Sequence, residues 1–139
     1  MPNNKRWGVL YCPKHELLSP KRRWEKIEKC LKDNGVEYDF IQSESSSGLD
    51  RLIKMMINNG YETIVIVGGD SALNAAVNCL MQYDSSVRER VVLGVIPNGL
   101  MNDFAHFWGF RESDYSQTIK WLKQRHVRKI DLGCIRYTN

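Results

Sequence analysis

Two glycine-containing segments carry the groups best suited to hold phosphate. Gly68-Gly69-Asp70 stands between a β-branched run and a segment with helical periodicity. Adjacent glycines allow unusual backbone angles and remove side chains, so phosphate oxygens can approach peptide N–H groups. The following helix adds free N–H donors and a partial positive charge at its start. This segment is a candidate phosphate site, although Gly-Gly is also a common turn.

The second segment runs from Ile96 to Ala105 and again puts a glycine turn between a strand and a helix. Asn102 and Asp103 follow Gly99, at positions suited to cap the helix and to meet a nucleotide or its metal ion. Neither segment is a Walker motif, and the chain has no G-x-S-x-G hydrolase elbow. The chemistry indicated is nucleotide or phosphate binding.

The elements that must position these segments alternate between strands and helices. β-rich runs predict strands at residues 7–11, 36–41, 63–67, 91–96 and 127–137. Periodic apolar positions predict helices at 20–34, from the serine cluster 43–47 to 59, and at 71–82, 102–108 and 113–125. Right-handed crossovers then give a three-layer α/β/α sandwich with a mainly parallel sheet. Ligands of such sheets bind beyond the carboxyl ends of the strands, where both glycine segments fall.

Composition restricts the class of protein. The chain has 139 residues, 42% of them hydrophobic, which is enough for one domain. No apolar run approaches the ~20 residues of a membrane span, and the N-terminus lacks the apolar stretch of a secretory signal. The four cysteines and three histidines are not spaced like the ligands of a metal ion. We therefore expect the cysteines to be reduced thiols, and we expect no metal site built from these side chains. These features predict a cytoplasmic protein.

The formal net charge of +4 is unevenly distributed. Residues 1–35 and 111–139 carry a basic excess, whereas residues 36–110 carry an acidic one. The basic ends could favour a phosphate-rich ligand or peripheral contact with an anionic membrane. They could equally be the solvated face of a helix. Aromatic residues are not interleaved with the basic ones, so nucleic-acid binding is not expected.

Together the two glycine segments resemble the motifs of a kinase family. Residues 68–78, GGDSALNAAVN, resemble the GGDGTLNEVVN motif of the diacylglycerol kinase catalytic-domain family, which includes bacterial lipid kinases and sphingosine kinases. Residues 94–105, GVIPNGLMNDFA, are similar to its G-I-I-P-x-G-T-x-N-D-F-A motif. The resemblance implies a nucleotide-binding α/β domain at 1–128, similar to the N-terminal domain of NAD kinase. Residues 129–139 would be the crossover strand to a C-terminal β-sandwich domain that this chain lacks.

The resemblance also implies an activity. Family members transfer the γ-phosphoryl group of ATP to a lipid hydroxyl with Mg²⁺, so ATP, Mg²⁺ and a diacylglycerol-like lipid are the expected ligands. Asp70 is the expected catalytic residue, which would orient the acceptor hydroxyl or a metal ion. The residues expected to bind the nucleotide are Ser43, Gly68, Gly69, Asp70, Ser71, Asn74, Gly99, Asn102 and Asp103.

Departures from the motifs keep other hypotheses open. Ser71, Ala72 and Ala75 replace the motif's glycine, threonine and glutamate, and Leu100-Met101 follows the second glycine. Each lost hydrogen bond is worth ~1 kcal/mol, so the affinity for nucleotide could fall by orders of magnitude. The alternative hypothesis is a catalytically inactive binding or regulatory module of the same fold. A relative of NAD kinase, which shares the GGD loop, is a third interpretation.

Overall fold

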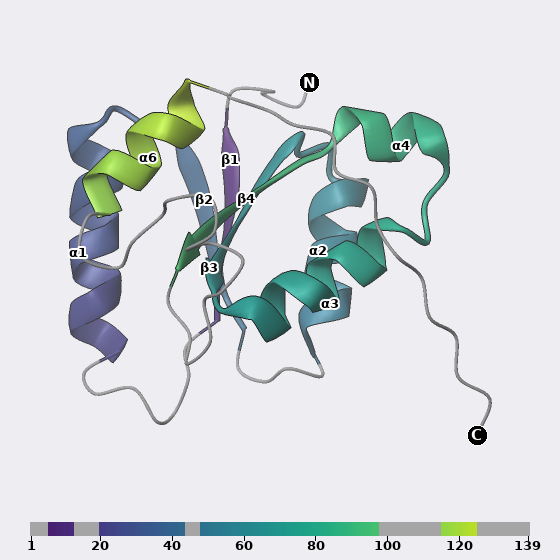
Figure 1. The fold of residues 1–139 in the computed structure, drawn as a ribbon, viewed down its shortest axis with the longest axis horizontal. Coiled ribbons are helices and arrows are strands. Elements are labelled where there is room, and N and C mark those ends of the chain that lie inside the picture. The colour runs from purple at the N-terminus through teal and green to yellow at the C-terminus, as the bar shows by residue number, and fades with distance from the viewer. Residues whose placement is uncertain (1–5, 13–19, 44–47, 98–114, 125–139) are drawn as a thin grey trace.

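In the computed structural model, which describes residues 6–12, 20–43, 48–97 and 115–124, helices cover both faces of one sheet (Figure 1). All strand pairs are parallel, in the order β2-β1-β3-β4. The strands are β1 (Trp7–Tyr11), β2 (Tyr38–Gln42), β3 (Thr63–Gly68) and β4 (Val92–Pro97). The helices are α1 (Pro20–Asp33), α2 (Leu49–Asn58), α3 (Asp70–Leu80), α4 (Ser85–Arg90) and α6 (Tyr115–Lys123). The predicted α/β/α class is confirmed.

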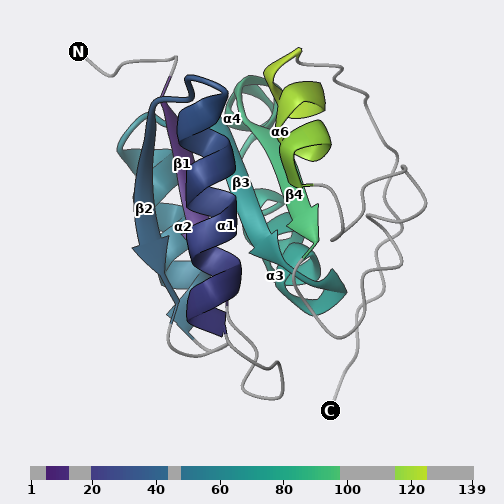
Figure 2. The same ribbon diagram turned by 90° about the vertical axis from the view of Figure 1, so that its left-hand side faces the viewer.

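The alternation of side chains along the strands divides the core into two halves. Val65 and Val67 of β3 pack under α1 and α6, with Ile27 and Ile119. Ile64 and Ile66 belong to the other half, under α2 and α3, with residues such as Ile53 and Ala76. Figure 2 shows α1 and α6 on one side of the sheet and α2 and α3 on the other. A strand buried on both faces needs an uninterrupted apolar run, which explains the composition of β3.

Glycines in the left-handed region end the first two helices. Gly35 has a φ of +68°. The amide of Val36 donates to the Leu31 carbonyl at 3.0 Å, and that of Gly35 to the Lys32 carbonyl at 3.0 Å. This is the Schellman arrangement, and a matching pair of bonds ends α2 at Gly60, whose φ is +91°. Both turns lead directly toward the amino end of a strand.

Several boundaries and one element differ from the prediction. β2 begins at Tyr38 rather than at residue 36, because Val36 completes the helix-ending turn. α3 spans Asp70–Leu80 rather than residues 71–82. α4 was not predicted; its six residues have no buried side chain, and its one signal is Asp84, whose carboxylate accepts a hydrogen bond from the amide of Val87 at 3.1 Å.

Other expectations fall on residues that the structure does not describe. These are the helix at 102–108, the strand at 127–137 and the domain boundary at 128–129. In the described part of the chain, no helix has both the length and the apolar character needed to cross a membrane. Cys12, Cys30 and Cys79 are free thiols.

Candidate nucleotide site at the carboxyl ends of the strands

The strand order creates a reversal point between β1 and β3. From β1 the chain crosses through α1 to β2 on one side, whereas from β3 it crosses through α3 to β4 on the other. In open α/β sheets the loops at such a point separate and leave a crevice beyond the carboxyl ends of the two strands. Gly68 ends β3 at this place, and Gly69 follows it.

Three residues form a row across the sheet at this edge. The amide of Ser43 donates to the Tyr11 carbonyl at 2.8 Å, and the amide of Cys12 donates to the Val67 carbonyl at 2.9 Å. The register therefore aligns Ser43, Cys12 and Gly68 one position beyond the last paired residues. Neighbouring strands lie ~4.8 Å apart, so the ends of this row are on the order of 10 Å apart.

The row lies on the face of the sheet that α2 and α3 cover. Ile41, Leu10 and Ile66, each two residues earlier in its strand, belong to the core half under these helices. Side chains alternate between faces along a strand, so the row shares this face. Ser43 is one of the few buried polar residues of the described chain, with a relative exposure of 6%. Cys12 was not predicted as a site residue; its signal was its position directly after a strand.

Gly68 lies where a side chain would be crowded. A Cβ atom at this position would lie 3.0 Å from the Cβ of Ala72 and 3.3 Å from the Cβ of Cys12. Both neighbours are the first atoms of their side chains, so they could make room only by a shift of the backbone. Glycine therefore suits the close approach of α3 to the ends of β1 and β3.

The expectation of unusual backbone angles at the two glycines is wrong. Gly69 has φ −106° and ψ −166°, which is extended backbone open to any residue. Among the described glycines, the positive φ values belong to Gly35 and Gly60, and not to Gly68 or Gly69. One extended residue is enough to lead β3 into α3, so the loop needs no left-handed residue.

The start of α3 supplies backbone donors at the same edge. Its first intrahelical bond runs from the amide of Leu73 to the carbonyl of Gly69, at 3.1 Å. The amides of residues 70–72 precede this bond and have no acceptor within the helix. Gly69, at the N-cap position, provides no side-chain cap. The partial positive charge of the helix start is directed toward the row.

The candidate site residues of α3 differ in how exposed their side chains are. Asp70 is half-buried in the first turn, whereas Ser71 and Asn74 are exposed. Ser71 has helical backbone, so replacement of the family glycine does not strain the chain here. The structure thus brings Ser43, Gly68, Gly69 and Asp70 to one edge. Gly99, Asn102 and Asp103 lie outside the described residues.

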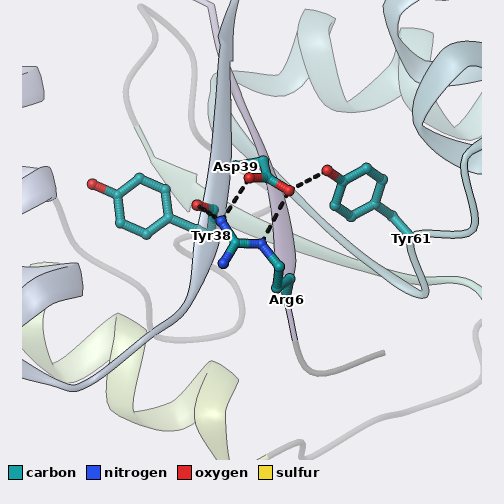
Figure 3. Close-up of polar contacts among 4 residues, drawn as sticks. All are labelled: Arg6, Tyr38, Asp39 and Tyr61. Carbon is teal, nitrogen blue, oxygen red and sulfur yellow. Dashed lines mark hydrogen bonds and ion pairs between the residues drawn. The ribbon is translucent and has the colours of Figure 1, made fainter. Parts of the chain in front are cut away.

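A second polar cluster lies at the opposite, amino edge of the sheet (Figure 3). Asp39 of β2 accepts hydrogen bonds from Arg6, at 2.6 Å and 3.1 Å, and from the hydroxyl of Tyr61. The bond from Arg6, followed by that from Tyr61, lowers the pKa of Asp39 below its ordinary value. The bond to Asp39, followed by burial, raises the pKa of Tyr61.

Comparison with known proteins identifies the fold's relatives. The sequence profile described as the diacylglycerol kinase catalytic domain matches residues 6–135. The chain belongs to the diacylglycerol kinase catalytic-domain family. Curated diacylglycerol kinases of Staphylococcus carnosus and Bacillus subtilis are 25% and 26% identical to it over 129 residues, 93% of this chain. A solved diacylglycerol kinase from Bacillus anthracis superposes on 89% of the chain with a TM-score of 0.73 at 18% identity.

The chain spans about two fifths of the length of these diacylglycerol kinases: 40% and 41% of the two curated relatives and 41% of the solved chain. Within the family match, Ala72 and Ala75 stand where the motif has threonine and glutamate. Ala72 is buried against Gly68, and Ala75 packs against the core under α2 and α3. The close junction of β3 and α3 is thus made with small side chains.

Proposed function

We propose that this chain is the nucleotide-binding part of an ATP-dependent lipid kinase, which transfers the γ-phosphoryl group of ATP to the hydroxyl of a diacylglycerol-like lipid. One observation carries the proposal: the first turn of α3 begins directly after Gly69, at the carboxyl end of β3 and at the reversal point of the sheet. A surface of peptide groups without side chains, next to a helix start, suits phosphate oxygens.

The proposed phosphate tail lies along the row of residues at the carboxyl edge. The amides of Ser71 and Ala72 would donate to phosphate oxygens at one end, and Ser43 would contact the nucleotide at the other. A row on the order of 10 Å long accommodates several linked phosphates rather than one. The binding energy comes from backbone donors, which the substitutions at 71, 72 and 75 leave in place.

Asp70 is the proposed acidic group of the site, because its carboxylate lies in the first turn of α3 beside those amides. The described residues contain no group of three or more potential metal-ligating His, Cys, Asp or Glu side chains. Proteins often hold Mg²⁺ through one or two carboxylates together with the phosphates of the substrate. Asp70 would hold the ion, which when bound neutralises charge on the transferring phosphoryl group.

The acceptor and the location are proposed from the relatives. Several are named diacylglycerol kinases, which supports a lipid hydroxyl as acceptor. We place the protein in the cytoplasm with peripheral contact to an anionic membrane, since its basic excess at residues 1–35 and 111–139 complements such a surface. No nucleic-acid partner is proposed.

A second candidate is an inactive binding module of the same fold. The specific support is Ala75, which replaces the motif's glutamate with a small side chain packed against the core. A carboxylate that contributes to catalysis at that position would be missing. This module would still bind nucleotide through the backbone of α3.

A titration tests nucleotide binding. Mg·ATP added to the isotope-labelled chain is expected to shift the amide resonances of residues 68–72 and of Ser43 at millimolar concentration or below, while adenosine leaves residues 68–72 unchanged because it has no phosphate. The distant amide of Gly35 serves as the internal control. Unchanged resonances at residues 68–72 with Mg·ATP would contradict the proposal.

A restoration experiment separates the two candidates. S71G/A72T/A75E, introduced into the protein that carries this chain, returns the family residues to α3. If the original and restored proteins both phosphorylate dioleoylglycerol at equal rates, the result supports the hypothesis of an active kinase. Activity that appears only after restoration supports the inactive module.

A further inference from the structure

β2 is the strand whose register is least specified by burial. It lies at the edge of the described sheet, and none of its five side chains is fully buried. In contrast, every residue of β1 and β3 is buried. When neither face of a strand is strongly buried, slipped pairings cost little, and a shift by one residue moves each side chain to the opposite face.

Aromatic and polar contacts hold β2 against α1 and β1. Phe40 stacks on Trp24 with ring centroids 4.1 Å apart, and the hydroxyl of Tyr38 donates to Glu28 at 3.1 Å. Phe40 also lies against Tyr11 of β1, with ring centroids 6.2 Å apart. These contacts gather toward α1, so a polar contact from β2 to both neighbouring strands would fix the pairing further.

The cluster of Arg6, Asp39 and Tyr61 provides that contact (Figure 3). Asp39 pairs in register with Gly8, and Arg6 precedes β1 by one residue. The guanidinium of Arg6 donates to both carboxylate oxygens of Asp39, and also to the Tyr38 carbonyl at 2.7 Å. A two-pronged contact of this kind has a fixed geometry that a slipped strand cannot reproduce.

Tyr61 ties the third strand to the same carboxylate. Its hydroxyl donates to Asp39, and it lies two residues before β3. Its ring passes over Gly8, where an added Cβ would lie 3.4 Å from ring carbons. One carboxylate of β2 is thus held from the amino ends of both β1 and β3.

The same three strands end in the three residues of the carboxyl row. Ser43 follows Asp39 by four residues, ~13 Å along the strand. A slip of β2 by two residues would move Ser43 away from Cys12 by ~7 Å, and a slip by one would turn it to the face under α1. The position of Ser43 therefore depends on a contact at the far end of its strand.

We propose that the cluster of Arg6, Asp39 and Tyr61 locks the register of β2 and thereby makes Asp39 a positioning residue for the nucleotide site. The first half of this inference concerns the fold alone. The second half rests on the proposed function, because it assumes that Ser43 contacts the bound nucleotide.

Hydrogen exchange tests the register lock. Asp39→Ala is expected to speed exchange of the Ser43 amide, which donates to Tyr11, by about tenfold relative to the amide of Cys12, which joins β1 to β3. Tyr38→Phe is the matched control, since it removes a hydroxyl from the same strand without touching the lock. If D39A is poorly folded, D39N and Y61F provide milder versions. An unchanged ratio of the two exchange rates in all three variants would overturn the lock.

Affinity for Mg·ATP tests the positioning role. Ser43→Ala and D39A are each expected to weaken binding by about fivefold, the value of one lost hydrogen bond. The double variant is expected to be no weaker than S43A, because both changes remove the same contact. Independent, multiplying effects, or a D39A variant that binds as tightly as wild type, would overturn the positioning role. Wild-type protein that binds no Mg·ATP would overturn both this role and the proposed function, while the exchange ratio would still decide the lock.

Discussion

At the amino ends of β2 and β3 the chain arrives through Gly35 and Gly60, with φ angles of +68° and +91°. At the carboxyl end of β3 it leaves through Gly68 and Gly69, where no positive φ occurs but an added Cβ at Gly68 would meet Ala72 at 3.0 Å. Glycine is thus used for backbone conformation at one edge of the sheet and for space at the other. The two uses cannot be told apart in a sequence, yet they predict different responses to alanine.

The edges also differ in the groups that hold them together. Side chains with opposite charges join the strands at the amino edge, where Asp39 meets Arg6. At the carboxyl edge, backbone bonds from Ser43 and Cys12 continue the pairing of the sheet. The start of α3 beside the carboxyl edge offers amide donors to a phosphate, whereas the amino edge presents charges that are already paired.

The largest effect is expected from Gly68→Ala. The new methyl meets two Cβ atoms that cannot move without the backbone, so unfolding free energy should fall by ~2 kcal/mol or more. Urea denaturation measures this loss. Ala72→Gly in the same chain should restore part of it, because the closest neighbour is removed. A G68A protein as stable as wild type would remove the spatial reason for this glycine.

Gly94→Ala should cost less, about 1 kcal/mol, although its nearest contact is shorter. The added Cβ would lie 2.9 Å from Cδ2 of Leu122 in α6, the end of a side chain that can rotate. The cost should be smaller still in a Leu122→Ala background, and a double-mutant cycle in urea measures the difference. Equal costs in both backgrounds would show that Leu122 is not the obstacle.

Gly35→Ala separates conformation from space, since no atom lies within 4 Å of the added methyl. Its cost of ~1 kcal/mol should come from the left-handed backbone alone. Asn tolerates this conformation better than Ala, so Gly35→Asn should recover about half of the loss in a thermal or urea melt. An alanine variant with unchanged stability would contradict the assignment.

The smallest effect is the pH dependence of Asp39. Arg6 and Tyr61 lower its pKa in the folded state below the ordinary value of 3.8. The unfolded chain therefore takes up the proton first as the pH falls. The stabilisation is fully present above pH ~5, where the unfolded carboxyl is also ionised, and is lost on acidification through the folded pKa. Asp39→Asn should make the urea midpoint less sensitive to pH between about 5 and 3, and equal slopes for both proteins would contradict this prediction.

Strong local patterns allowed much of the fold to be predicted. β3 and β4 follow from runs rich in β-branched residues, β1 follows from an apolar and aromatic run, and the end of α1 follows from Gly35. α4 has six residues and no apolar face, so periodicity could not reveal it. The start of β2 was predicted two residues too early, because the amide of Val36 bonds to the carbonyl of Leu31 at the end of α1. Strand propensity takes no account of this bond.

The candidate site was predictable in part. Adjacent glycines and an acidic residue at a helix start form a local pattern, which marks residues 68–70 in the sequence itself. Their backbone geometry was predicted wrongly. A glycine in a sequence can serve either an unusual backbone conformation or a lack of space, and the residue type alone does not distinguish the two. Arg6, Asp39 and Tyr61 come together only through strand pairing, and their separation in the chain left no local pattern.

The strand order has a consequence for synthesis of the chain. Val9 of β1 pairs with Val65 of β3, fifty-six positions further along. Until β3 has left the ribosome, β1 has only β2 as a neighbour, and the middle of the sheet cannot form. Closing so long a loop is slow, and it comes before the β3–α3 junction can meet the end of β1. The proposed phosphate site therefore cannot form until β3 and the start of α3 have emerged and β3 has paired with β1.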